Sequence, residues 1–174
     1  MTFKQTLALC CFAAGLAGAA QASTPADGGA NERYMKAIRL AGASPMPAPA
    51  QRQAYLAEAL VAARENRASS DPDTALSGLL QEASALTQLG KTQEALALLD
   101  GKFPASLSLG MQALFIHHRG VIEYSVDPAR GLASMNEAIA MTTDKEFKAH
   151  LIMMRDSRLG LPVTTLEGTT TSIP

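Results

Sequence analysis

The chain has 174 residues, of which 47% are hydrophobic and only 5% aromatic, and tryptophan is absent. Its 15 basic and 16 acidic residues leave a formal net charge of -1. This balance lacks the basic surplus typical of nucleic-acid-binding proteins, so we expect no nucleic-acid partner. Alanine and leucine dominate the apolar positions, and such residues favour helices over strands. The composition therefore predicts an all-α protein.

Residues 1–22 have the pattern of a secretory signal peptide. Lys4 supplies a positive charge, an uncharged apolar stretch follows, and Ala20-Gln21-Ala22 is the small-x-small pattern that precedes signal-peptidase cleavage. The apolar stretch is rich in glycine and alanine and is shorter than the roughly 20 residues that a membrane-spanning helix requires. We therefore expect cleavage before Ser23, no stable membrane insertion, and a periplasmic or secreted product.

The expected mature chain contains no cysteine, because Cys10 and Cys11 both lie in the signal. Its stability must then come from packing rather than from disulfides. Removal of the signal leaves 14 basic and 16 acidic residues, or a net charge of 14 minus 16, which is -2. The remaining 174 minus 22, or 152, residues suit a single domain.

The mature chain divides by composition into a leader, a helical domain and a tail. Residues 23–30 are turn-rich and predict a flexible linker, and residues 160–174 carry a threonine run and predict a flexible tail. Between them, residues 31–159 have apolar residues at helical spacing. This spacing predicts six to seven helices, at about 31–42, 51–66, 72–89, 91–101, 106–124 and 128–141, with a last helix after 143.

Start signals mark three of these helices. In Asp71-Pro72 and Asp127-Pro128, the aspartate can accept a free amide hydrogen of the first turn. Proline has no amide hydrogen, so none is left unpaired at the first helical position. Thr143 and Glu146 have the spacing of a capping box for the last helix. We therefore expect helices to begin directly after these positions.

One helix pair resembles a tetratricopeptide repeat. Leu79, Ala83 and Leu86 match the large, small and large residues of that family's first helix. Gly90 matches its turn, where glycine enters a left-handed conformation without strain, and Ala95 matches the small residue at the helix crossing. The resemblance implies a short α-solenoid of antiparallel helix pairs.

The next pair fits the same pattern with one uncertainty of register. Gly131 lies 36 residues after Ala95, close to the roughly 34 expected of these repeats. Arg119 falls where a small residue is expected, unless the register slips by one to Gly120. Residues 31–66 match only in helix spacing, so another array of helical hairpins and a plain helix bundle remain alternatives.

The resemblance also implies a function, namely a non-catalytic scaffold of the bacterial envelope that binds a protein or peptide partner. The partner would lie in a groove lined by the first helix of each pair. The predicted groove residues are Leu80, Ser84, Thr87 and Gln88 from one unit, and Ile116, Glu123 and Tyr124 from the next. The alternative to a groove role for Leu80 and Ile116 is an ordinary position in the apolar core. Arg158, on the last helix, is expected to be neutral for partner binding.

The sequence predicts no catalytic residue, metal site or cofactor site. His117 and His118 are adjacent, so on a helix they point about 100 degrees apart and do not converge on one ion. His118 lies on an apolar face, which favours a core histidine. Gly90-Lys91-Thr92 resembles the end of a phosphate-binding loop but lies between two helices rather than after a strand.

Two other functions remain open. One is a structural subunit that associates with itself or joins an envelope complex, which an exposed apolar end after Met154 would favour. The other is an enzyme or a helical domain that binds a small ligand in an internal pocket, although no converging set of polar residues supports it.

Overall fold

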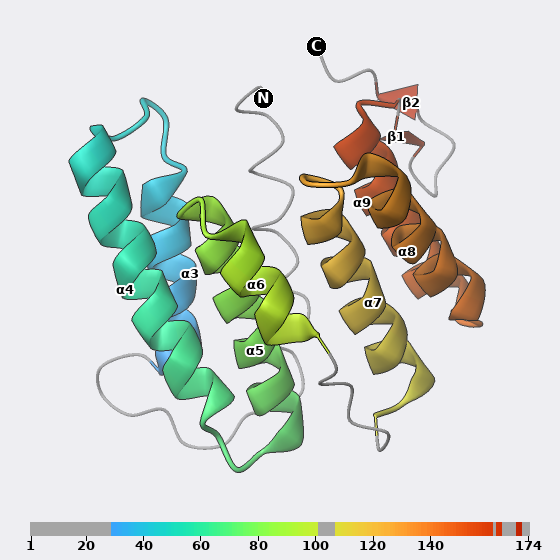
Figure 1. The fold of residues 1–174 in the computed structure, drawn as a ribbon, viewed down its shortest axis with the longest axis horizontal. Helices are drawn as coiled ribbons and strands as arrows, with labels where there is room; N and C mark the ends of the chain where they lie inside the picture. The colour runs from blue at the N-terminus through green and yellow to red at the C-terminus, as the bar shows by residue number, and fades with distance from the viewer. Residues whose placement is uncertain (1–28, 101–106, 162, 165–169, 172–174) are drawn as a thin grey trace. The chain divides into compact units, whose positions relative to one another are not determined.

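A computed structural model describes residues 29–100, 107–161, 163–164 and 170–171. The expected signal peptide and most of the expected linker lie outside these residues. Within them the protein is all-α, as predicted (Figure 1). Its helices are α3 (Ala30–Ala41), α4 (Pro49–Arg67), α5 (Pro72–Gln88), α6 (Thr92–Leu99), α7 (Leu109–Glu123), α8 (Pro128–Met141) and α9 (Lys145–Leu159). In the part of the chain described, no helix is long and apolar enough to cross a membrane.

Two short strands follow the last helix. β1 (Val163–Thr164) and β2 (Thr170–Thr171) pair in antiparallel register, with Val163 opposite Thr171. The sequence did not predict this ladder, because a run of threonines carries no alternating apolar pattern.

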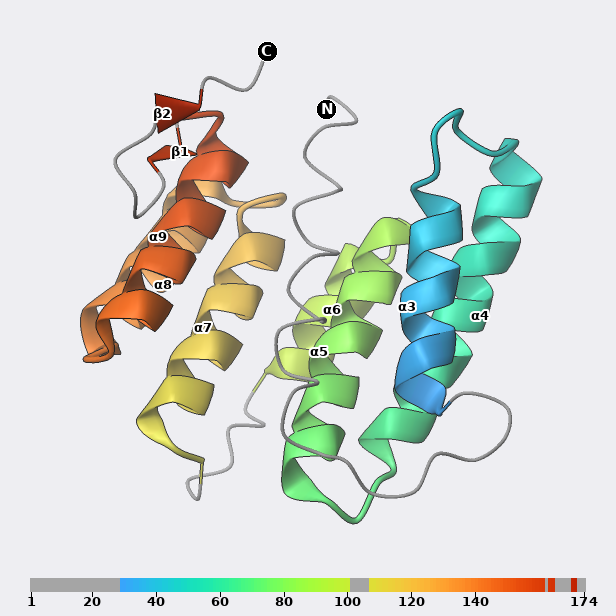
Figure 2. The ribbon, with the colours of Figure 1, turned by 180° about the vertical axis from the view of Figure 1, so that it is seen from behind.

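The chain divides into two compact units, Met1–Leu98 and Leu99–Pro174. In the first unit α4 packs against both α3 and α5, which Figure 2 shows from behind. Tyr34, Ile38 and Leu56 lie in the apolar core of this unit. The α4–α5 contact is close because Gly78 has no side chain: a Cβ atom added there would lie 2.1 Å from the backbone nitrogen of Arg67.

The turn between α5 and α6 has the predicted geometry. Gly90 has a φ of 81 degrees, in the left-handed region. Its amide donates to the carbonyl of Thr87 at 3.0 Å, and the amide of Lys91 donates to the carbonyl of Leu86 at 2.9 Å. These two bonds form a Schellman motif, which satisfies carbonyls that the end of a helix leaves open. Ala95, the predicted small residue of α6, is fully buried.

Two of the predicted helix starts are confirmed and one is wrong. The carboxylates of Asp71 and Asp127 accept the amides of the third residues after them, at 2.9 and 3.1 Å. The predicted capping box at Thr143 is not formed. Asp144 caps α9 instead, accepting the amide of Phe147 at 2.7 Å. A carboxylate caps better than a hydroxyl here, because the positive end of the helix dipole favours its negative charge.

In the second unit α7 packs against α8, and α9 contacts both helices. The small residue of α7 at the crossing is Gly120, so the register slips by one from Arg119. A Cβ atom added to Gly120 would lie 2.9 Å from the carbonyl oxygen of Gly131 in α8. Leu151 of α9 is fully buried in a core shared with Ala113 and Ala138.

Candidate functional site

Four predicted groove residues lie on α5, in the first unit. Leu80 and Ser84 are buried, whereas Thr87 and Gln88 are half-buried. The hydroxyl of Thr87 donates to the carbonyl of Ala83 at 2.8 Å, within the same helix. The accessible part of this predicted set therefore lies at the carboxyl end of α5.

The other three predicted groove residues lie at α7, in the second unit. Ile116 is half-buried against the core of that unit. Glu123 is buried, and Tyr124 is half-buried under Arg158, whose guanidinium carbon lies 5.9 Å from the centre of the tyrosine ring. A guanidinium group over an aromatic face is attracted by it, so Arg158 contacts a predicted groove residue. Its neutrality for partner binding stays a prediction.

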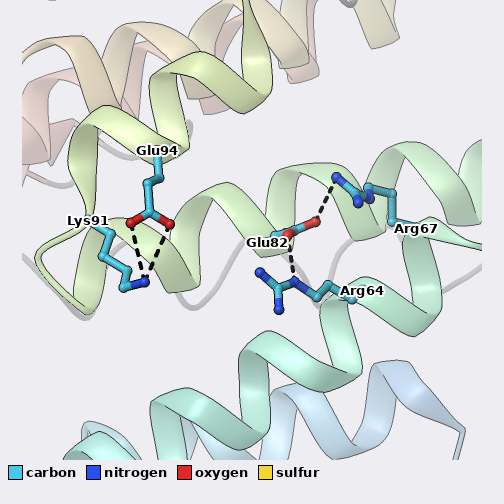
Figure 3. Close-up of polar contacts among 5 residues, drawn as sticks. All are labelled: Arg64, Arg67, Glu82, Lys91 and Glu94. Carbon is cyan, nitrogen blue, oxygen red and sulfur yellow. Dashed lines mark hydrogen bonds and ion pairs between the residues drawn. The ribbon is translucent and has the colours of Figure 1, made fainter.

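The first unit contains a cluster of charged side chains that sequence reasoning missed. Arg64 and Arg67 lie one turn apart at the end of α4, so they share a face of that helix. Glu82 of α5 lies between them (Figure 3). Nε of Arg64 is 2.8 Å from Oε1 of Glu82, and Nη1 of Arg67 is 3.0 Å from Oε2. We call these three residues the Glu82 cluster.

Burial divides the Glu82 cluster into an inner carboxylate and two outer guanidinium groups. The side chain of Glu82 is only 5% exposed, whereas those of Arg64 and Arg67 are 54% and 41% exposed. A buried carboxylate is costly unless it is paired, so two arginines stabilise it better than one. The cluster retains one net positive charge, on its solvent side.

Figure 3 also shows a pair of a different kind. Nζ of Lys91 lies 3.2 Å from Oε1 of Glu94, and both side chains are about half exposed. An exposed pair of this kind contributes little to stability. The Glu82 cluster, with its buried acid, is the stronger candidate for a site.

The second unit also pairs a buried glutamate, Glu123, with two arginines, although here one arginine lies on the same helix as the glutamate. Nε of Arg119 lies 2.9 Å from Oε1 of Glu123, and Nε of Arg130 lies 3.1 Å from the same oxygen. The hydroxyl of Ser134 donates to Oε2 at 2.6 Å. In both units a buried glutamate thus lies beneath two arginines. Sequence reasoning placed Glu123 in the groove, but the arginines occupy the outer positions.

A chain of neutral side chains crosses the first unit close to Glu82. Nδ2 of Asn66 donates to Oε1 of Gln81 at 2.8 Å, and Nε2 of Gln81 donates to Oδ1 of Asn31 at 2.7 Å. These bonds join α3, α4 and α5 and satisfy polar groups that burial would otherwise penalise. They serve to hold the helices together.

The two adjacent histidines are both buried in α7. Nε2 of His117 lies 3.2 Å from the carbonyl oxygen of Leu151 in α9, so the neutral ring donates from Nε2. Burial lowers the pKa of His117 to about 3 and that of His118 to about 4. For His117 the nearby charges of His118, His150 and Arg155 act in the same direction as burial, whereas the hydrogen bond to Leu151 opposes them. Among the described residues, no three His, Cys, Asp or Glu side chains are grouped as metal ligands.

Comparison of the chain with protein-family models, with curated proteins and with solved structures found no match.

Proposed function

We propose that the chain is an exported, non-catalytic scaffold that resembles the tetratricopeptide repeat family and binds a protein or peptide partner in the bacterial envelope. The observation that carries the proposal is the turn between α5 and α6. Gly90 adopts the left-handed conformation, and Ala95 is fully buried. These are the two positions where the family requires special residues, one for conformation and one for size.

The polar side chains also support a scaffold rather than an enzyme. Glu82, Glu123 and Gln81 each bond to a neighbouring helix of their own unit. Groups bound in this way stabilise helix packing, whereas a catalytic set must converge on a space where a substrate can lie.

Export rests on the sequence of residues 1–22. It is tested by mass spectrometry of the protein isolated from its native host. The proposal expects a chain that begins at Ser23. An intact chain from Met1 in the cytoplasmic fraction would contradict it.

Partner binding is tested by photo-crosslinking in envelope preparations. A photoreactive residue replaces Gln88 or Ile116, which are half-buried members of the predicted groove, and exposed Glu58 of α4 serves as the control position. The proposal expects the same partner protein to crosslink from Gln88 and Ile116 but not from Glu58. If no protein crosslinks from the groove positions, the scaffold proposal fails.

A second candidate is a subunit that associates with itself. Met153 of α9 and Leu161, just beyond that helix, are 37% and 48% exposed. Exposed large apolar side chains at the end of a helical array favour association with another surface. Analytical ultracentrifugation distinguishes the candidates: a dimer that Met153→Gln with Leu161→Gln abolishes would favour self-association.

A further inference from the structure

We propose that Arg64 and Arg67, held in place by Glu82, form a docking site for an acidic peptide segment of the partner protein. This inference rests on the proposed scaffold function and specifies the chemistry of the partner. It depends on the geometry of the Glu82 cluster, on the exposure of its arginines and on its charge.

The geometry leaves hydrogen-bond donors available on the outer side of the cluster. Arg64 bonds Glu82 through Nε, so among the described residues both of its terminal Nη groups remain for another acceptor. Arg67 uses Nη1. Within the described part of the chain, neither guanidinium group is paired with a second carboxylate. Two parallel donors on the end of a guanidinium group match the two oxygens of a carboxylate.

Glu82 supplies the preorganisation that an exposed arginine ordinarily lacks. A free arginine side chain loses rotamer freedom when it binds, and that loss weakens binding. Here the buried carboxylate already restrains both guanidinium groups while they remain about half exposed. Their ordering therefore takes place during folding rather than during binding.

Charge selects the occupant. The cluster has one net positive charge, and the neighbouring side chains of Arg33 and Glu65 form an ion pair with each other. The chain as a whole is slightly acidic, so the attraction is local rather than a general property of the surface. Two guanidinium groups one helical turn apart suit successive carboxylates of a peptide, whereas nucleic acid favours a longer basic stripe.

The test measures binding of a fluorescent Glu-rich peptide to the purified protein by anisotropy at low salt. The test variant is Arg64→Gln with Arg67→Gln and Glu82→Gln, in which no buried charge is left unpaired. The control is Lys36→Gln with Arg39→Gln on α3. Its two cations are exposed and have the same spacing, and its net charge falls by two, against one for the test variant. Circular dichroism shows whether each variant is folded.

We expect the peptide to bind the unmodified protein and the control with equal affinity. Its affinity for the test variant should be lower by a factor of about ten or more. Added salt should weaken binding, because the charges are partly exposed. If the test variant does not fold, Arg64→Gln alone leaves Glu82 paired with Arg67 and should still weaken binding.

Three results would overturn the inference. The first is equal binding of the Glu-rich peptide by the unmodified protein and by the folded test variant, or by Arg64→Gln where the test variant does not fold. The second is binding of a Lys-rich peptide, or of single-stranded DNA of the same length, as tightly as the Glu-rich peptide. The third is no binding of the Glu-rich peptide while the crosslinked partner is still captured, which would leave the scaffold proposal intact.

Discussion

Gly131, near the start of α8, lies against the backbone of Tyr124 at the end of α7. A Cβ atom added to Gly131 would come within 2.3 Å of the amide nitrogen of Tyr124 and 2.6 Å of the carbonyl oxygen of Gly120. Both contacts are with backbone, which cannot move aside as a flexible side chain can. The close packing of α7 and α8 therefore requires glycine at this position.

Gly131→Ala should destabilise the protein, although alanine favours a helix over glycine by roughly 0.5–1 kcal/mol. Overpacking at the crossing should outweigh this gain and cost about 1–3 kcal/mol in the free energy of unfolding. The control is Gly110→Ala in α7, where an added Cβ meets only Oγ of Ser108, at 4.0 Å. Thermal melting followed by circular dichroism should show a lower Tm for the first variant and an equal or higher Tm for the second.

Ala95→Leu should overfill the packed interior around α6, because Ala95 is fully buried and leaves no room for a larger side chain. We expect a loss of about 1–3 kcal/mol in the free energy of unfolding. Ala97→Leu, at an exposed position of the same helix, adds the same side chain and should leave stability nearly unchanged. Urea denaturation of the two variants measures the difference. Equal midpoints would contradict the role of Ala95 as the small residue of the hairpin.

The Glu82 cluster should respond asymmetrically to loss of its members. Arg64→Gln with Arg67→Gln leaves a buried carboxylate without a cation, so we expect a loss of about 3–5 kcal/mol in the free energy of unfolding. Glu82→Gln should cost less, because both arginines are partly exposed and water can solvate them. Urea denaturation of the three proteins gives the order, and a larger loss for Glu82→Gln than for the arginine variant would contradict it.

The buried histidines should make the protein unstable in acid. The pKa of His117 falls to about 3 and that of His118 to about 4 in the folded state, below the ordinary value of 6.5. A histidine with a lowered folded pKa stabilises fully above its unfolded pKa, and this stabilisation is lost as the pH falls. As the pH falls from about 7 to about 5, the two histidines together should lower the free energy of unfolding by about 3–4 kcal/mol.

Urea denaturation at several pH values measures this loss. His117→Gln with His118→Gln should flatten the dependence on pH, since the amide of glutamine does not titrate, and the amide at 117 can still donate to the carbonyl of Leu151. An unchanged dependence on pH in the double variant would assign the acid instability to other groups.

The helical architecture could be predicted because its determinants are local. Asp71, Asp127 and Gly90 act on backbone groups within a few residues of themselves, and the apolar spacing repeats with the period of the helix. The same locality explains the error at α9, where adjacent Thr143 and Asp144 could both cap a helix. The choice between them lies within the usual uncertainty of one or two residues at a helix end.

The candidate site was accessible to sequence reasoning only in part. Glu82 interrupts the apolar run of α5, and a charge within such a run is a sign of a buried ion pair. Its partners could not be inferred, because Arg64 and Arg67 lie on another helix. Which side chains of α4 and α5 face one another depends on the distance between these helices. Gly78 permits their close approach.

The sequence by itself thus determined the helical class, the helix starts at Asp71 and Asp127, the turn at Gly90, and the small residue Gly131 at the α7–α8 crossing. Only the tertiary structure decided that Gly120 rather than Arg119 lies at the α7–α8 crossing, and that Glu82 and Glu123 lie beneath arginines. The physical reason is that capping and turn formation involve neighbours along the chain, whereas burial and ion pairing depend on contacts between helices.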